Sequence, residues 1–388
     1  MQNYQRFYSR FLSQNSQWQH YAAHSHHYWP DVTRDAMMQY WDDSAQYTDQ
    51  KWEYFFSQII PKAQQHIARH LNVTNWQQIA FAPNTHEFVV RLLSCFPHKK
   101  KIKILTTDAE FYSFDRQIKA LIENQLAEVD FVSTNDFSSF EQRFIKQSQQ
   151  KDYDLVFLSQ VFFNSGFVIQ DLTQLIQAIP GESLIVVDGY HGFMAVPTDL
   201  GPVQDRVFYI AGSYKYAQGG EGCCFMYIPP SCSLRPVNTG WFASFGALKD
   251  QSQLVSYANT GFRFAGSTMD FTAVYRLNAV MDLFEREKIQ VSHIHQHVQQ
   301  LQSRFLDVIR ELNHDELCED RIVNHEDRER LKINAHFYAF NLDSLEQTEK
   351  MYQLLKKHMV LTDFRGTRLR FGFGLYQNER IQLDFLKK

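Results

Sequence analysis

The chain has 388 residues, of which 44% are hydrophobic and 15% aromatic, and it carries a formal net charge of −4 at pH 7. This length suffices for a large domain with a smaller one attached, and the near-neutral charge gives no signature of a nucleic-acid or membrane partner. Five cysteines show no zinc or CxxC spacing, and no apolar run has the length of a membrane span or a signal peptide. We therefore expect a cytoplasmic protein without a disulfide framework or a bound metal.

The first fifty residues are rich in Gln, His, Tyr and Trp. His24, His26 and His27 lie too close together for the spacing that zinc sites show, so a surface loop is the simpler interpretation. Helical periodicity over residues 51–70 then marks the start of an expected large domain that extends to residue 259.

A short apolar strand over residues 79–82 runs directly into a helical pattern over residues 87–95. Free N–H groups at the start of a helix, with the helix dipole behind them, bind phosphate. The turn between the two segments is therefore a candidate anion site. A plain helix cap at Asn84 or Thr85 is the alternative.

Strands and helices then alternate along the chain. The expected strands are 102–107, 129–132, 155–159, 184–187 and 207–210, and the expected helices are 116–125, 138–149 and 172–179. This alternation predicts an α/β fold with a mostly parallel sheet covered by helices on both faces. Asn164 follows the strand 155–159 and is expected to line the crevice at the end of the sheet.

The last third of the chain predicts a smaller α+β domain, residues 260–388, against which residues 1–50 are expected to pack. Its expected elements are two long helices within 271–312, a strand at 335–341, a helix at 345–358 and a strand at 368–373. His293, His295 and His297 lie on one of these helices. The stretch around them is polar, which favours a solvated face over a metal site.

Two strand ends carry side chains that are costly to bury. Strand 184–187 ends on Asp188, and strand 207–210 is followed by Lys215 between two tyrosines and then by a glycine-rich loop. Because neighbouring parallel strands end in one crevice, both side chains are expected there. A desolvated lysine can form a Schiff base with an aldehyde, and a buried carboxylate can pair with a pyridinium nitrogen. A solvated loop lysine and a structural salt bridge are the simpler alternatives.

Six motifs carry a family resemblance: SQVFFNSG, VDGYHGFMAVPTDL, SYKYAQGGEG, TGWF, FAGSTMDFT and TDFRGTRLRFGFGLY. Over residues 79–376 the chain resembles the class V branch of pyridoxal-phosphate-dependent enzymes, most closely kynureninase. The resemblance implies their transferase fold, in which a seven-stranded type of sheet forms the large domain. It also implies pyridoxal 5′-phosphate as the cofactor and an α-amino acid, bound through an external aldimine, as the substrate.

The same resemblance implies roles for individual residues at the cofactor. Lys215 would form the Schiff base and act as general base, and Asp188 would keep the ring nitrogen protonated. His191 would orient the ring or the Asp188 carboxylate. The remaining implied contacts are to the phosphate and the ring face: Asn84, Thr85, His86, Ser213 and Tyr214 for the phosphate, and Phe111 for stacking on the ring.

A shared site in an obligate homodimer is also implied. Ser267, with Thr268 beside it, matches a loop that in relatives reaches the phosphate from the neighbouring subunit, and Trp241 would lie in the same interface. For substrate binding, Arg370 would hold the carboxylate through a bidentate pair, with an internal ion pair as the alternative. The other expected substrate contacts are His24, Ser25, His26 and Asn164.

Departures from the kynureninase pattern fall near the expected substrate. They affect the loop that begins at Phe111, the two residues after Trp241 and Phe242, and HSHH at residues 24–27. Such changes favour a class V aminotransferase, with kynureninase-like hydrolysis of a Cβ–Cγ bond as the alternative.

Two further functions are disfavoured. A non-catalytic binding protein of this fold would not need Lys215 and Asp188, and both are present. Cysteine desulfuration needs a cysteine nucleophile, and the stretch before Arg370 that resembles the C-terminal region of relatives contains none.

Overall fold

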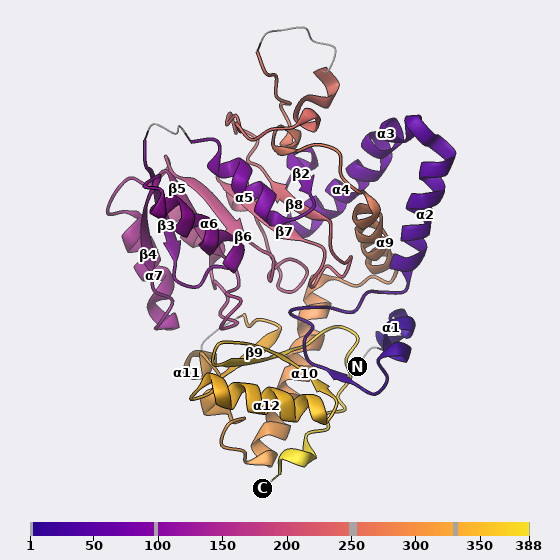
Figure 1. Ribbon diagram of the computed structural model, residues 1–388, viewed down its shortest axis with the longest axis vertical. Coiled ribbons are helices and arrows are strands. Elements are labelled where there is room, and N and C mark those ends of the chain that lie inside the picture. Colours follow the sequence, from indigo (N-terminus) through magenta and orange to yellow (C-terminus); the bar gives the residue numbers. More distant parts are fainter. Residues whose placement is uncertain (1–2, 97–99, 248–253, 329–332, 388) are drawn as a thin grey trace.

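The computed structural model describes residues 3–96, 100–247, 254–328 and 333–387. Its centre is a sheet with the strand order β2-β8-β7-β6-β5-β3-β4, in which β8 alone runs antiparallel to its neighbours (Figure 1). The predicted α/β fold with a seven-stranded, mostly parallel sheet is confirmed. The strands are β2 (Ile79–Ala82), β3 (Ile102–Thr107), β4 (Ala127–Val132), β5 (Leu155–Ser159), β6 (Leu184–Asp188), β7 (Val207–Gly212) and β8 (Cys224–Tyr227).

Helices cover both faces of this sheet, because alternate strand residues enter two separate apolar clusters. On one face, Phe157 and Val186 pack with α5 and α6; on the other, Val156 and Val187 pack with α4, α7, α8 and α9. Strands buried on both faces have near-continuous apolar sequences, so the sequence located them well. The helices are α4 (Ile60–Leu71), α5 (Thr85–Leu93), α6 (Tyr112–Glu123), α7 (Phe137–Ser148), α8 (Leu172–Ala178) and α9 (Thr272–Arg286).

A smaller antiparallel sheet has the order β11-β12-β9 and encloses a second core with α10 and α12 (Figure 1). Helix α9, which the predicted boundary at residue 260 assigns to the small domain, contributes to the core of the large sheet. The domain limits stay a prediction. The elements are β9 (Phe337–Asn341), β11 (Asp363–Arg365), β12 (Arg368–Gly372), α10 (Val291–Leu312), α11 (His325–Arg328) and α12 (Leu345–Lys357).

The N-terminal segment contacts both cores. β1 (Gln19–His20) pairs in parallel with β10 (Val360–Leu361), and Tyr21 lies in the second core. α1 (Ser9–Gln14) precedes this strand. α2 (Val32–Tyr47) follows it and packs along α9 (Figure 1). α2 was not predicted, because its buried residues, Thr33, Ala36 and Asp43, form no apolar periodicity.

Two helical segments differ most from their predicted bounds. The helix predicted over residues 51–70 consists of α3 (Lys51–Tyr54), a π-helical stretch (Phe55–Ile59) and α4, which begins just before Pro61. Proline has no N–H to donate, so a regular hydrogen-bond ladder cannot run through this point. α6 begins at Tyr112 rather than at the predicted Arg116. Within the described residues, no helix combines the length and the apolar character needed to cross a bilayer.

Candidate active site

A cavity of about 260 Å³ lies at the carboxyl ends of β6 and β7. Asp188 ends β6 and pairs in register with Ile210 of β7, and Lys215 follows β7 directly. The strand ends therefore bring both side chains to one cavity, as expected for a parallel sheet. Its lining residues are Pro83, Asn84, Thr85, His86, Phe111, Ser113, Ser159, Val161, Phe163, Asp188, Tyr190, His191, Tyr214, Lys215, Glu221, Gly222 and Cys224.

Lys215 is buried and surrounded by aromatic rings. Its Nζ lies 4.8 Å from the centroid of the Tyr190 ring, 5.5 Å from that of Phe111 and 5.9 Å from that of Tyr214. Burial lowers the pKa of the Lys215 ammonium to about 7, although the charge of Asp188 acts in the opposite direction. The amine is therefore largely deprotonated at slightly alkaline pH, which is the form that attacks a carbonyl.

His191 is the direct partner of this lysine, with Nε2 at 2.6 Å from Lys215 Nζ. Burial, together with the charge of Lys215, lowers the pKa of His191 well below its usual value, so the ring is neutral. A neutral ring that accepts a hydrogen bond at Nε2 carries its proton on Nδ1. His191 Nδ1 is buried and has no hydrogen-bond partner. The cavity wall thus contains a hydrogen-bond donor, His191 Nδ1, that has no acceptor in this structure.

Asp188 faces the cavity from the end of β6. Its Oδ1 accepts a hydrogen bond from the backbone N–H of Tyr190 at 2.9 Å. Burial raises the pKa of the Asp188 carboxyl, whereas the Tyr190 N–H and the charge of Lys215 lower it. A second cation in the cavity, such as a protonated ring nitrogen, would further stabilise the ionised carboxylate.

Helix α5 begins at the cavity wall, with Asn84, Thr85 and His86 among the lining residues. The Asn84 side chain caps the helix, because its Oδ1 accepts the backbone N–H of Glu87 at 3.0 Å. The plain-cap interpretation is therefore correct for the Asn84 side chain. The positive end of the helix dipole nevertheless points at the cavity, so the predicted phosphate role of this turn remains a prediction.

Several predicted cofactor residues do not line the cavity. The Ser213 hydroxyl donates to the backbone oxygen of Gly220 at 2.5 Å and so holds the glycine loop closed. Trp241 Nε1 donates to Thr268 Oγ1 at 3.3 Å, and Ser267 and Thr268 are exposed. These three residues, Trp241, Ser267 and Thr268, form a surface patch on this chain, and their predicted role in a neighbouring subunit's site stays a prediction.

We predict that this patch is a dimer interface. Trp241→Glu is expected to weaken self-association by about 2 kcal/mol or more, roughly 30-fold in the dissociation constant, because aromatic side chains dominate such interfaces. Light scattering across a dilution series measures the shift from dimer to monomer. Trp41→Glu is the matched control, since Trp41 is exposed on α2. A wild-type chain that is monomeric and fully active would contradict the prediction.

The predicted substrate residues Arg370, His24 and Ser25 also lie outside the cavity lining. All three contact Asp363: Arg370 Nε donates to Asp363 Oδ1 at 2.8 Å, His24 Nε2 lies 2.8 Å from Asp363 Oδ1, and Ser25 Oγ donates to Asp363 Oδ2 at 2.8 Å. Arg370 therefore forms the internal ion pair that sequence reasoning kept as the alternative.

The structure also shows the surroundings of the other two expected substrate residues, Asn164 and His26. The Asn164 side-chain oxygen is buried without a partner, and the His26 ring packs edge-on against Tyr214 at 5.6 Å. Neither residue lines the cavity. Their contacts with a substrate stay a prediction.

Sequence reasoning missed a buried carboxyl beside the site, Glu110. It accepts hydrogen bonds from Ser159 Oγ at 2.6 Å and from Thr107 Oγ1 at 2.7 Å, and burial raises its pKa to about 7. Ser159 is paired in register with Asp188, so Glu110 ties the turn that carries Phe111 to the strand ends of the site. The sequence does contain a signal for Glu110, because a carboxyl that follows a buried strand so closely needs hydrogen-bond partners if it is buried.

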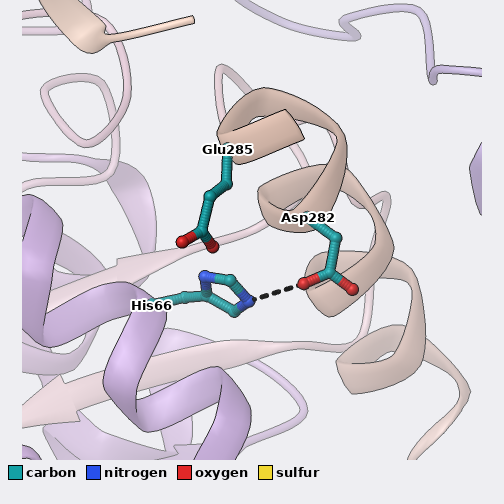
Figure 2. A group of neighbouring side chains, drawn as sticks. All are labelled: His66, Asp282 and Glu285. Atoms are coloured by element: carbon teal, nitrogen blue, oxygen red, sulfur yellow. Dashed lines mark hydrogen bonds and ion pairs between the residues drawn. The ribbon is translucent and has the colours of Figure 1, made fainter. Parts of the chain in front are cut away.

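One group of potential metal ligands occurs among the described residues: His66, Asp282 and Glu285, between α4 and α9 (Figure 2). His66 Nε2 lies 3.1 Å from Asp282 Oδ1. Lys62 Nζ lies 2.6 Å from Asp282 Oδ2, and Arg69 Nη2 contacts both His66 and Glu285. Because two cations already neutralise the carboxylates, the group is an ion-pair network that joins the two helices.

The prediction that the histidines of α10 lie on a solvated face is only partly correct. His293 is exposed as expected, but His297 is buried and His295 Nδ1 lies 3.0 Å from His336 Nε2. Burial lowers the pKa values of His295 and His297. The polar sequence of this stretch gives no sign of their burial, because the rings that contact them, Tyr4 and His336, come from distant segments.

The fold is similar to that of solved cysteine-processing enzymes. The cystine C-S lyase C-DES, solved with its reaction product cysteine persulfide, gives a TM-score of 0.75 at 17% identity, covering 94% of this chain and 94% of that chain. A cysteine desulfurase from Thermococcus onnurineus NA1 gives 0.79 at 16% identity, covering 97% and 95%. Cysteine desulfurase CsdA from Escherichia coli gives 0.77 at 15% identity, covering 98% and 95%. At these identities the likeness shows the fold, and no curated protein matches the chain.

The cavity fits the predicted cofactor, pyridoxal 5′-phosphate. Lys215 offers a buried amine for its aldehyde, Asp188 a carboxylate for its ring nitrogen, and the unpartnered His191 Nδ1 a donor for a ring substituent. The family model described as aminotransferase class-V matches residues 22–360, which is most of the chain. The chain therefore belongs to the class V aminotransferase family, and its cofactor is pyridoxal 5′-phosphate.

Proposed function

We propose that this protein is an aminotransferase that moves the amino group of an α-amino acid to a keto acid. The observation that carries the proposal is the Lys215 amine, which is buried, lies 2.6 Å from His191 Nε2 and shares its cavity with Asp188. Transamination needs one group that removes a proton from the substrate and returns it at a different atom. A lysine with a pKa near neutrality can do both.

When bound, pyridoxal phosphate supplies an electron-accepting ring that stabilises negative charge on the substrate α-carbon. Asp188 keeps the ring nitrogen protonated, because its buried carboxylate favours a cationic neighbour. His191 holds the Lys215 amine through its Nε2 and so fixes the point from which the amine takes the α-proton. The rings of Phe111, Tyr190 and Tyr214 exclude water from the amine and help to keep it neutral.

The cavity lacks the nucleophile that desulfuration requires. Among the described residues, Cys224 is the one cysteine in the cavity lining. Burial raises the pKa of the Cys224 thiol to about 12, so it stays protonated, and the Tyr190 hydroxyl lies 3.4 Å from its sulfur. Since the thiolate is the reactive form, Cys224 is not suited to take a sulfur atom from a substrate.

Single amino acids, offered with and without pyruvate as acceptor, test the proposal. We expect sustained product formation from at least one amino acid, and only when the keto acid is present. Without it, the reaction should stop after one equivalent per site, because the amino group has no acceptor. Sustained cleavage of kynurenine without pyruvate would favour the hydrolase alternative and contradict transamination. A complete lack of turnover across the panel would also contradict it.

A further inference from the structure

The Arg370 guanidinium is occupied by a carboxylate from its own hairpin. Asp363 on β11 and Arg370 on β12 are directly paired in the sheet register, so their side chains lie on the same face. Arg370 Nε donates to Asp363 Oδ1 at 2.8 Å, and Nη2 donates to Oδ2. This is the bidentate geometry in which an arginine binds the carboxylate of a ligand.

Asp363 is held in this position by the N-terminal segment. His24 Nε2 lies 2.8 Å from its Oδ1, and Ser25 Oγ donates to its Oδ2 at 2.8 Å. His24 is fully buried and stacks on the Phe337 ring at 4.9 Å. Both carboxylate oxygens are therefore shared: Oδ1 between Arg370 and the buried His24, and Oδ2 between Arg370 and the half-buried Ser25.

The ion pair lies directly behind the cavity wall. Phe163 lines the cavity, and its backbone oxygen accepts a hydrogen bond from Arg370 Nη1 at 2.6 Å. The Phe337 ring contacts His191, with 5.6 Å between the ring centroids, and the Arg370 guanidinium lies 5.9 Å from the Phe337 centroid. The guanidinium thus contacts one residue of the cavity lining, Phe163, directly and a second, His191, through the Phe337 ring.

Within the described part of the chain, Lys215 is the one lysine or arginine in the cavity lining, and it is committed to the cofactor. Arg365 Nη2 also lies 3.8 Å from Asp363 Oδ2, but its side chain is 40% exposed, whereas Arg370 is buried. A substrate carboxylate that pairs with this buried arginine would have to take it from Asp363.

We propose that Asp363 is a specificity-determining residue that competes with the substrate α-carboxylate for Arg370. The inference rests on the proposed function, because it assumes an amino-acid substrate. Asp363 and the substrate would form the same bidentate pair, so exchanging them brings little net energy, and the tethered carboxylate has the advantage of a high effective concentration. The site therefore binds α-carboxylates weakly and selects amino acids chiefly through other groups.

The competition predicts a gain of affinity when the competitor is removed. In Asp363→Asn the buried guanidinium loses its counter-charge, and an added carboxylate can restore it. We expect propionate, titrated into the protein by calorimetry, to bind at least about 10-fold more tightly to Asp363→Asn than to the wild type, in keeping with the strength of charge-assisted pairs. Propionamide, which has the same size and no charge, should show no such gain.

Two control variants separate this role from a purely structural one. Adding Arg370→Gln to Asp363→Asn should abolish the gain. Asp343→Asn removes a surface aspartate that pairs with Arg321 at 2.5 Å and should leave propionate binding unchanged. Thermal melts with and without propionate report folding, and propionate should raise the Tm of Asp363→Asn.

If Asp363→Asn fails to fold, Ser25→Ala decides the question. This change removes one hydrogen bond from the competitor and should tighten propionate binding by about 2- to 5-fold. Unchanged or weaker propionate binding in the folded variants would overturn the inference. The titrations require no turnover, so their failure is distinct from a failure of the proposed transamination, which the amino-acid panel detects.

Discussion

Replacing Lys215 by Ala is expected to remove the visible absorption band of the lysine-linked cofactor and to slow amino-group transfer by about 10³-fold or more. The change deletes the amine that joins the cofactor and the base that moves the proton. His191 does not replace it, because burial keeps its pKa well below the usual value and makes the ring a weak base. Absorbance spectra of the purified protein and single-turnover rates measure both effects.

A matched variant shows whether the effect belongs to this lysine. Lys62→Ala removes an exposed lysine of α4 that pairs with Asp282 of α9 and does not line the cavity, so it should leave the band and the rate unchanged. Methylamine added to Lys215→Ala should restore part of the rate, since a free amine can take over proton transfer. A Lys215→Ala protein that keeps the band would refute the assignment.

Acidification from pH 7 to about pH 4 is expected to destabilise the fold by several kcal/mol. In the N-terminal segment, His24 and His27 are buried and His20 is half-buried: desolvation lowers the pKa of His20 to about 3 and the pKa values of His24 and His27 to about 4. The unfolded chain, with ordinary values near 6.5, binds more protons between pH 6.5 and pH 4. The stability that these histidines contribute is therefore complete above pH 6.5 and is lost as the pH falls through this window.

The size of the effect follows from the pKa shifts. Each histidine costs up to about 1.4 kcal/mol per pH unit below its unfolded value, and domains are stable by only about 5–15 kcal/mol. Glu110 acts in the opposite direction, because its raised pKa, about 7, adds stability as the pH falls toward 4.5. One such carboxyl does not offset three histidines.

Denaturant unfolding at pH 7, 6 and 5 measures this dependence. His27→Gln should reduce the slope of the unfolding free energy against pH by about one proton. The matched control is His293→Gln, which changes an exposed histidine of α10 and should leave the slope unaltered. An unfolding free energy that stays constant between pH 7 and pH 5 would contradict the prediction.

The sheet and the centre of the site could be predicted because their signals are local. β2, β3 and β5 have the predicted bounds to the residue, since buried strands are apolar runs that end at polar or turn-forming residues. The meeting of Asp188 and Lys215 followed from the geometry of neighbouring parallel strands. Neither inference required knowledge of how distant segments pack.

The parts that escaped prediction depend on distant segments. Asp43 is buried on α2 because the Tyr275 hydroxyl of α9 donates to it at 2.7 Å, a contact that no periodicity in α2 reveals. The sequence left two interpretations of Arg370, a contact with the substrate carboxylate and an internal ion pair. The choice between them depends on the pairing of β11 with β12 and on the position of His24. Long-range hydrogen bonds of this kind leave no pattern in either segment alone.

The parallel pairing of β1 with β10 affects how the protein must be made. β1 leaves the ribosome long before its partner β10 is translated. Until α10, β9 and β12 emerge, Tyr21 has no core to enter, and it is exposed to chaperones or to aggregation. The residues that line the cavity around the reactive amine lie between Pro83 and Cys224, so this part of the site can assemble before the N-terminal strand finds its partner.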